Sequence, residues 1–148
     1  MNEIIQIGDL KIGQGGPLFL ISGPCVIEEE NLTLQIARVL REIGEELDIQ
    51  VIFKTSFDKA NRTSLDSYRG PGLERGLEVM AMIKEETGLP VLSDVHESVQ
   101  VERAADVLDV IQIPAFLCRQ TDLLLAAART GLPINIKKGQ FVSPWAME

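Results

Sequence analysis

The sequence is poor in the residues that mark several classes of protein. Its 148 residues include two cysteines, one histidine, one tryptophan and one tyrosine. The two cysteines, Cys25 and Cys118, are far apart, so a disulfide-rich fold is excluded and a bond between them is not expected in a reducing compartment. We interpret them separately, with Cys118 as a small buried residue in an apolar context.

Long apolar runs and an excess of positive charge are also missing. No run of about 18 consecutive apolar residues occurs, so no transmembrane helix is predicted. The net charge is −8, which argues against nucleic acid as the main partner, because binding to phosphate backbones needs a basic face. The N-terminal Met1-Asn2-Glu3 lacks the basic, apolar and small-residue order of a signal peptide. These features predict a cytoplasmic protein.

Short apolar runs alternate along the chain with longer amphipathic stretches. The short runs are typical of strands buried on both faces, and the stretches between them have helical spacing. Strands are predicted over residues 18–22, 51–55, 91–94, 110–114 and 134–137. Helices are predicted over residues 32–47, 73–87 and 101–108, and a fourth from Thr121, as its N-cap, to Gly131.

Strand and helix alternation predicts a parallel sheet with right-handed crossovers, which is either a (β/α)8 barrel or an open doubly wound sheet. The first strand lacks a Gly-x-Gly-x-x-Gly turn, which argues against a dinucleotide-binding sheet. Charged residues follow most strand ends, as they do at the C-terminal rim of barrels. We therefore predict an α/β fold of the TIM-barrel type, preceded by a hairpin over residues 4–12 that turns at Gly8-Asp9.

The element count is too small for a whole barrel. A complete barrel needs eight strands, eight helices and about 250 residues, whereas this sequence predicts five strands and four helices. We expect a single partial domain over residues 1–148, corresponding to an N-terminal half, with the hairpin in residues 1–16 and barrel strands in residues 17–148. The sequence leaves open why the chain stops after the fifth strand.

Cations gather at the predicted strand ends, while acids concentrate on the helices. Seven of the 14 lysines and arginines lie in strand-end loops: Lys54, Lys59, Arg62, Arg69, Arg119, Lys137 and Lys138. Arginine binds phosphate bidentately and lysine binds it as a compact charge. A locally positive rim on an acidic chain therefore predicts a small phosphorylated ligand.

Six motifs occur in the order and at close to the spacing of one enzyme family. They are Gly23-Pro24-Cys25 with Glu28, the loop Phe53–Ser64, Ser67–Gly72, Asp94–Ser98, Ile111–Asp122 and Lys137–Phe141. Together they resemble the 3-deoxy-D-manno-octulosonate 8-phosphate synthases, and in particular the metal-dependent class. Because the motifs run through nearly the whole chain, the resemblance is specific.

The resemblance implies a transferase that condenses phosphoenolpyruvate with D-arabinose 5-phosphate and water, giving 3-deoxy-D-manno-octulosonate 8-phosphate and phosphate in lipopolysaccharide biosynthesis. It implies catalytic roles for Lys54, Lys59, Asn61 and Lys137. The implied substrate-binding residues are Arg62, Thr63, Asp94, Gln112, Phe116 and Arg119. In this interpretation the three lysines and Gln112 hold phosphoenolpyruvate, and Asn61, Arg62 and Thr63 hold the sugar phosphate.

A divalent metal, such as zinc, iron or manganese, is also implied. Family members with cysteine at the position of Cys25 use a metal and those with asparagine do not, and thiolate is a good ligand for Zn²⁺ or Fe²⁺. The His, Glu and Asp that complete the metal site in the family have no match in this chain. Arg119 is expected to reach into a neighbouring subunit of a homotetramer. His96 is either catalytic or a polar residue packed beneath the site.

Two alternatives stay open at this point. The related 3-deoxy-heptulosonate 7-phosphate synthases use erythrose 4-phosphate and typically have Lys-Pro-Arg-Thr, whereas residues 59–63 read Lys-Ala-Asn-Arg-Thr, which favours the five-carbon sugar. The second alternative is a catalytically inactive N-terminal fragment. We expect the isolated chain to be inactive, because an unclosed barrel leaves strand edges and apolar helix faces uncovered.

Overall fold

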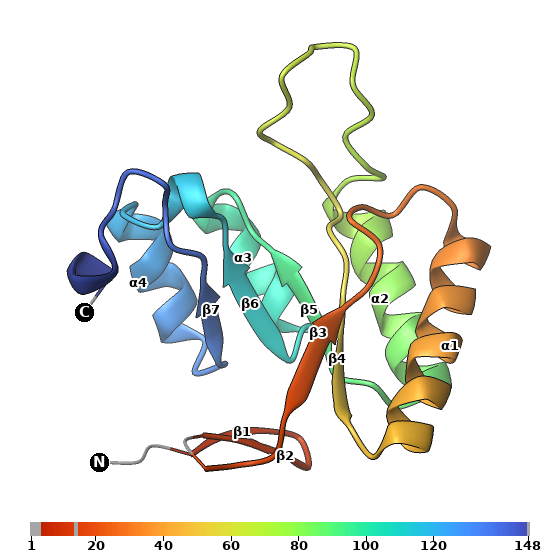
Figure 1. Cartoon of the computed structure of the whole chain (residues 1–148). Coiled ribbons are helices and arrows are strands. Elements are labelled where there is room, and N and C mark those ends of the chain that lie inside the picture. The colour runs from red at the N-terminus through yellow and green to blue at the C-terminus, as the bar shows by residue number, and fades with distance from the viewer. Residues whose placement is uncertain (1–3, 14, 148) are drawn as a thin grey trace.

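The computed structural model describes residues 4–13 and 15–147, which form half of a barrel (Figure 1). Five parallel strands make one sheet: β3 (Phe19–Ser22), β4 (Gln50–Lys54), β5 (Val91–Asp94), β6 (Val110–Ile113) and β7 (Ile134–Ile136). Their order in the sheet is the same as their order in the sequence. This confirms the predicted partial (β/α)8 barrel.

Four helices connect consecutive strands and lie along one side of the sheet (Figure 1). They are α1 (Glu30–Leu47), α2 (Leu73–Thr87), α3 (Ser98–Ala105) and α4 (Thr121–Arg129), and two short 3-10 helices follow β6 and β7, η1 (Ala115–Leu117) and η2 (Pro144–Met147). Among the described residues, no helix is both long and apolar enough to cross a membrane.

The start of α4 differs from the prediction. Gln120 is the N-cap, Thr121 is the first helical residue, and no side chain caps this end. The preceding turn determines the start, because the backbone N–H of Gln120 donates to the carbonyl of Leu117 at 3.0 Å. The predicted end of α2 is confirmed, since Gly88 adopts the left-handed conformation that glycine tolerates best (φ 69°).

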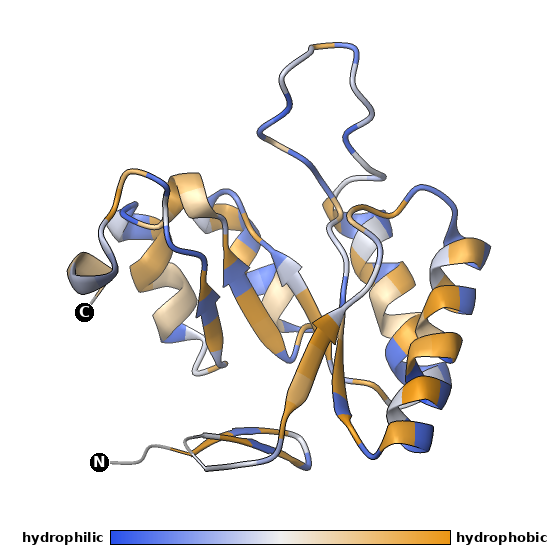
Figure 2. Cartoon of the chain, in the orientation of Figure 1, coloured by the Kyte–Doolittle hydropathy of each residue, from blue (hydrophilic) through white to orange (hydrophobic). Residues whose placement is uncertain are grey.

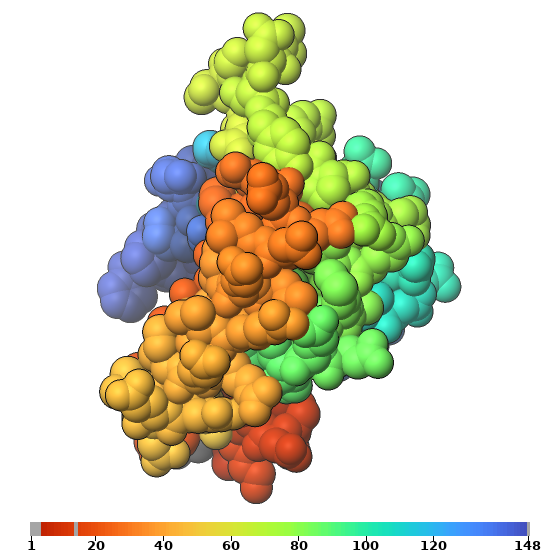
Figure 3. All heavy atoms as spheres, turned by 90° about the vertical axis from the view of Figure 1, so that its right-hand side faces the viewer, coloured from red at the N-terminus to blue at the C-terminus, as the bar shows by residue number. Residues whose placement is uncertain are grey.

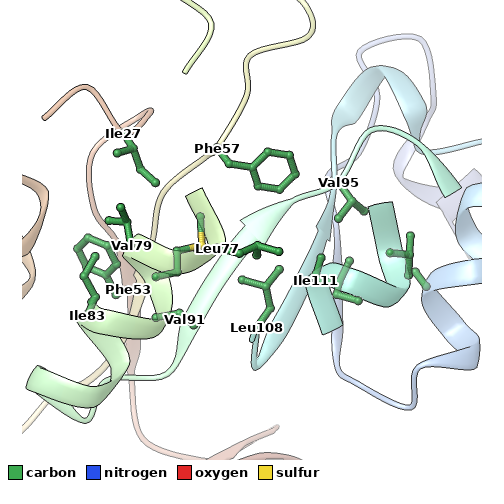
Figure 4. Close-up of a cluster of buried hydrophobic side chains, with 14 of the residues drawn as sticks. Ile27, Phe53, Phe57, Leu77, Val79, Ile83, Val91, Val95, Leu108 and Ile111 are labelled. Atoms are coloured by element: carbon green, nitrogen blue, oxygen red, sulfur yellow. The ribbon is translucent and has the colours of Figure 1, made fainter. Parts of the chain in front are cut away.

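The two faces of the sheet pack against different partners, because side chains alternate along each strand. On the outer face, Phe53, Val91 and Ile111 belong to the main core with side chains of the helices, such as Leu77 and Ile83 (Figure 4). The inner face forms a separate cluster of Ile52, Leu92 and Val110 with Ile7 of the N-terminal hairpin.

The hairpin consists of β1 (Ile5–Ile7) and β2 (Leu10–Ile12), which pair antiparallel and turn at Gly8-Asp9, as predicted. Gly8 has a φ of 57°, a conformation that glycine adopts at little cost. The hairpin lies below the amino ends of the barrel strands (Figure 1). Its Ile7 side chain thereby covers the bottom of the inner face.

A long loop, residues 55–72, joins β4 to α2 and projects beyond the carboxyl ends of the strands (Figures 1 and 3). It is coloured as mostly hydrophilic in Figure 2, in contrast to the strands. Its base is closed by a hydrogen bond from the Lys59 N–H to the Arg69 carbonyl at 2.7 Å and by an ion pair between Arg69 and Asp58. The closed base fixes Lys59 near the strand ends and leaves the tip of the loop exposed.

Candidate active site

A cavity of about 290 Å³ lies at the carboxyl ends of β4 to β7. It is lined by seven of the residues that the sequence predicted for the site, namely Lys54, Lys59, Asn61, Asp94, Gln112, Phe116 and Lys137. A groove between α3 and α4 is larger, at about 460 Å³, but Arg129 is its only cation among the described residues. Chemistry, and not size, therefore singles out the cavity at the strand ends.

Strand periodicity explains why these side chains converge. Lys54, Asp94 and Gln112 each follow by two residues a member of the apolar inner-face cluster, so they point to the same side of the sheet. The register pairs Asp94 with Gln112 across β5 and β6. Parallel strands thus bring to one edge residues that are far apart in the sequence.

Lys54 is surrounded by other charges inside this cavity. Burial lowers the pKa of Lys54, and the positive charges of Lys59 and Lys137 lower it further, against the opposing influence of Asp94 and Cys25. The ammonium form of Lys54 is therefore held at a cost that an incoming anion would offset.

Asp94 is the only carboxylate that lines the cavity in the described part of the chain, and both of its oxygens are engaged. Ser56 donates its hydroxyl to Oδ1, and His96 Nε2 lies 3.0 Å from Oδ2. Burial by itself raises the pKa of Asp94, but the hydrogen bonds of His96 and Ser56 and the charges of His96 and Lys59 outweigh it and lower the pKa to about 2. Asp94 is therefore held ionised at the edge of the cavity by two side chains.

Gln112 is held by a residue that the sequence analysis missed. Asn135 on β7 donates its side-chain amide to Gln112 Oε1 at 3.0 Å, and no described residue accepts from the Gln112 amide, whose hydrogens can bind a ligand. The register pairs these two residues directly. Ser56 and His96 were likewise not assigned to the site as partners of Asp94. The Ser56 contact joins residues 38 positions apart, and the His96 contact, although local in sequence, depends on the direction of its ring.

The remaining predicted substrate residues do not line the cavity. Arg62 donates its Nε to the Tyr68 carbonyl at 3.1 Å, Thr63 is exposed on the tip of the loop, and Arg119 is exposed after η1. Fewer cations than expected are available to a ligand at the strand ends. Lys138 donates its Nζ to two backbone carbonyls, and the charge of Arg69 is paired with Asp58.

Cys25 lies in the turn between β3 and α1 and is a free, exposed thiol, whereas Cys118 is free and buried, as predicted. Two hydrogen bonds hold this turn against the long loop, from the Ile27 N–H to the Ser56 carbonyl at 3.1 Å and from the Tyr68 hydroxyl to the Ile27 carbonyl at 2.9 Å. Within residues 4–13 and 15–147, no three His, Cys, Asp or Glu side chains are grouped closely enough to hold a metal ion. These residues offer a metal one thiolate at this turn.

Comparison with known proteins identifies the family of this chain. Residues 2–148 match the model of the DAHP synthetase I family. Proteins named 2-dehydro-3-deoxyphosphooctonate aldolase are 58% identical over 147 residues in Syntrophotalea carbinolica, 60% over 148 in Geobacter sp. strain M21 and 61% over 148 in Cyanothece sp. strain PCC 7425.

These alignments cover 99 to 100% of this chain but 53 to 54% of the relatives. The chain therefore spans about half the length of the curated relatives that it matches. The relatives confirm the family resemblance that the motifs indicated, and the chain belongs to the DAHP synthetase I family.

Proposed function

We propose that these residues form part of the active site of an enzyme that condenses phosphoenolpyruvate with D-arabinose 5-phosphate. The observation that carries the proposal is the convergence of Lys54, Lys59 and Lys137 on one cavity. Phosphoenolpyruvate has a carboxylate and a phosphate, and the only carboxylate among the described lining residues is already bound on both oxygens. With three lysines and one carboxylate, the described lining residues present more positive than negative charge to a ligand.

The size and charge of the cavity suit one small, multiply charged anion. Its volume of about 290 Å³ is near the lower end of ligand sites. The lowered pKa of Lys54 reflects the cost of keeping this ammonium buried beside two like charges. Binding of an anion would relieve that repulsion, and fixed cations would also stabilise the charge that develops as phosphate leaves.

In the proposed reaction, C3 of phosphoenolpyruvate attacks the sugar aldehyde, water adds to C2, and inorganic phosphate leaves from C2. Lys54, Lys59, Lys137 and Gln112 hold phosphoenolpyruvate beside the aldehyde. Holding two reactants in attack geometry lowers the activation free energy by roughly 7–11 kcal/mol. These residues therefore act chiefly by binding and orienting.

The sugar phosphate is assigned to the long loop and to a second subunit. We infer that Asn61, which lines the cavity, binds the sugar, and that Arg62 and Thr63 turn towards its phosphate when it is bound. Arg119 would reach the site of a neighbouring subunit in a homotetramer. In this proposal the five-carbon sugar phosphate lies above the lysine cavity. The proposed enzyme is cytoplasmic and belongs to lipopolysaccharide biosynthesis.

We also propose that Cys25 supplies one ligand to a divalent metal, zinc, iron or manganese, whose other ligands lie outside these 148 residues. Its exposed thiol near Lys54 fits this role, and the bound metal would supply Lewis-acid chemistry. Cys25→Asn should lower the metal content of the complete enzyme at least tenfold, as measured by elemental analysis. Unchanged metal content would contradict the assignment.

The reaction is best tested in a hybrid enzyme in which these 148 residues replace the matching segment of the Geobacter sp. strain M21 relative. The hybrid should release phosphate from phosphoenolpyruvate with arabinose 5-phosphate at least tenfold faster than with erythrose 4-phosphate. A preference for the four-carbon sugar would support the heptulosonate alternative. The isolated 148-residue chain, assayed in parallel, should show no turnover.

A matched pair of lysine variants tests the role of the cavity. Lys137→Met in the hybrid should raise the KM for phosphoenolpyruvate at least tenfold, because it removes a cation that faces the ligand. Lys138→Met is the control, since the Lys138 ammonium is bound to backbone carbonyls and does not line the cavity. Equal effects of the two substitutions on the KM would overturn the proposed binding site.

A further inference from the structure

Four polar side chains form one continuous hydrogen-bonded chain at the floor of the cavity. The Lys59 Nζ lies 2.8 Å from the Ser56 hydroxyl, which in turn donates to Asp94 Oδ1, and His96 Nε2 lies 3.0 Å from Asp94 Oδ2. Ser56 is fully buried, and the side chains of Asp94 and His96 are 9% and 10% exposed. This series of hydrogen-bonded side chains therefore begins in the protein interior at His96 and ends at the Lys59 ammonium in the cavity.

The chemistry of the groups fixes the direction of every hydrogen bond. An ammonium can only donate and an ionised carboxylate can only accept, so the Ser56 hydroxyl accepts from Lys59 and donates to Asp94. The remaining oxygen of Asp94 accepts from His96, which places a proton on Nε2. The other ring nitrogen of His96, Nδ1, is buried and has no partner in the described residues. Among the described residues, the series of hydrogen-bonded side chains therefore does not extend beyond His96.

The buried end of the chain is held rigidly. Phe57 packs edge-on against the His96 ring, with ring centroids 5.9 Å apart. The backbone N–H of His96 donates to the Gln100 side-chain oxygen at 2.9 Å. Phe57, seen in Figure 4, can approach α2 only because residue 76 is glycine, where an added Cβ would lie 2.2 Å from the Cβ of Phe57. The position of His96 is therefore determined by the core.

We propose that Ser56 and His96 are positioning residues that act through Asp94 and fix the ammonium of Lys59 in the phosphoenolpyruvate site. Lysine is a flexible side chain whose ordering costs up to about 2 kcal/mol of rotamer entropy. The hydrogen-bonded chain orders Lys59 before the ligand arrives. Asp94 thus serves, through Ser56, as an anchor for Lys59. This inference rests on the proposed function of the cavity.

The kinetic test uses the hybrid enzyme and compares two His96 variants. His96→Gln retains a donor near the position of Nε2, whereas His96→Leu fills similar space without one. We expect His96→Leu to raise the KM for phosphoenolpyruvate at least tenfold while the KM for the sugar changes less than twofold, and His96→Gln to stay within threefold of the parent. A merely structural role would change both KM values and the active fraction together, and that result would overturn the proposal.

A double-mutant cycle tests whether Ser56 acts through Lys59. Ser56→Ala should raise the KM for phosphoenolpyruvate at least tenfold in the parent but less than twofold when Lys59 is already methionine, because the residue that it positions is then absent. Equal effects in the two backgrounds would contradict the inferred route.

A measurement on the chain itself separates this inference from the proposed function. In nuclear magnetic resonance of the chain labelled with ¹⁵N-lysine, the Lys59 ammonium is identified by its loss in Lys59→Met. Its hydrogen exchange with water should accelerate at least tenfold in Ser56→Ala and in His96→Leu, but not in His96→Gln. If the hybrid shows no turnover and this pattern is still found, the proposed function fails while the positioning role stands. Unchanged exchange in both Ser56→Ala and His96→Leu would overturn the positioning role.

Discussion

Two layers of side chains on the inner face of the sheet have opposite characters, although they are only two residues apart along the same strands. The lower layer is Ile52, Leu92 and Val110, and the upper layer is Lys54, Asp94 and Gln112. The lower layer packs against the hairpin, where burial of apolar surface stabilises the fold. In the upper layer Asp94 and Gln112 are buried and Lys54 is partly buried, so these polar groups need hydrogen bonds and opposite charges to offset the cost of desolvation.

This contrast shows how one strand carries both stabilising apolar residues and residues of the candidate site. Position along the strand decides which of the two a residue supports, because loops and other side chains at the carboxyl ends can supply polar partners. Ser56 and His96 do so for Asp94, and Asn135 does so for Gln112. In the described part of the chain the lower layer is surrounded by apolar side chains, so a polar group there would remain unsatisfied.

The largest expected effect on stability comes from placing a lysine in the lower, apolar layer. Ile52→Lys would bury an ammonium among Leu92, Val110 and Ile7, and we expect it to lower the free energy of unfolding by about 4 kcal/mol or more. Urea denaturation followed by circular dichroism measures this. A loss below about 1 kcal/mol would show that the lower layer tolerates charge and would remove the contrast.

The matched control for this experiment is the reverse change in the upper layer. Lys54→Met should leave the free energy of unfolding unchanged or slightly raised, because burial is the main cause of the lowered pKa of Lys54 and disfavours its charged form. The same variant should lose affinity for phosphoenolpyruvate.

The next largest effect on stability concerns Gly23, the residue that follows β3. The φ of Gly23 is 153°, and an added Cβ would lie 2.0 Å from the Lys54 carbonyl oxygen. We expect Gly23→Ala to destabilise the chain by about 3 kcal/mol, measured by the same urea titration. Gly131→Ala is the control, because it shares a positive φ of 74° but has no atom within 4 Å of the added Cβ. If both substitutions cost the same, backbone strain alone explains the result and close packing at Gly23 contributes nothing.

A smaller effect is the pH dependence of the free energy of unfolding, to which Asp94 of the upper layer contributes. The pKa of Asp94 is lowered from 3.8 to about 2 in the folded chain, so its stabilising contribution is present above pH 3.8 and is lost as the pH falls through about 2. The shift corresponds to about 2 kcal/mol. Acid titration of the free energy of unfolding should therefore fall less steeply in Asp94→Asn than in the parent between pH 4 and 2. Parallel curves would contradict the assigned role of Asp94.

The smallest expected effect tests the apolar layer by itself. Val110→Ala should cost about 1.5 kcal/mol at any pH between 4 and 8, because the 4% exposed Val110 side chain loses two carbon atoms of packing. Val99→Ala on α3 is the control, since Val99 is 81% exposed and should change stability by less than about 0.5 kcal/mol. A strong pH dependence of the Val110→Ala effect would indicate that the two layers are energetically coupled.

The sequence by itself was sufficient to predict the fold class and several residues that line the cavity at the strand ends. Apolar runs of four or five residues identified every strand of the sheet to within about one residue, since buried parallel strands are apolar on both faces. Gly88 correctly predicted the end of α2. The long motifs identified Lys54, Lys59 and Lys137, and strand alternation then places cations at the carboxyl ends. These are local signals, which depend on residues close in the chain.

Only the tertiary structure decided how the polar groups are partnered. The bond between Ser56 and Asp94 joins residues 38 positions apart, and no local pattern specifies the sheet register and rotamers on which it depends. For the same reason the sequence did not predict the Asn135 contact with Gln112, or that Lys138 turns to backbone carbonyls while its neighbour Lys137 lines the cavity. Hydrophobic periodicity determines which face of an element is buried, whereas hydrogen-bond geometry depends on atoms that only the packed fold brings within 3 Å.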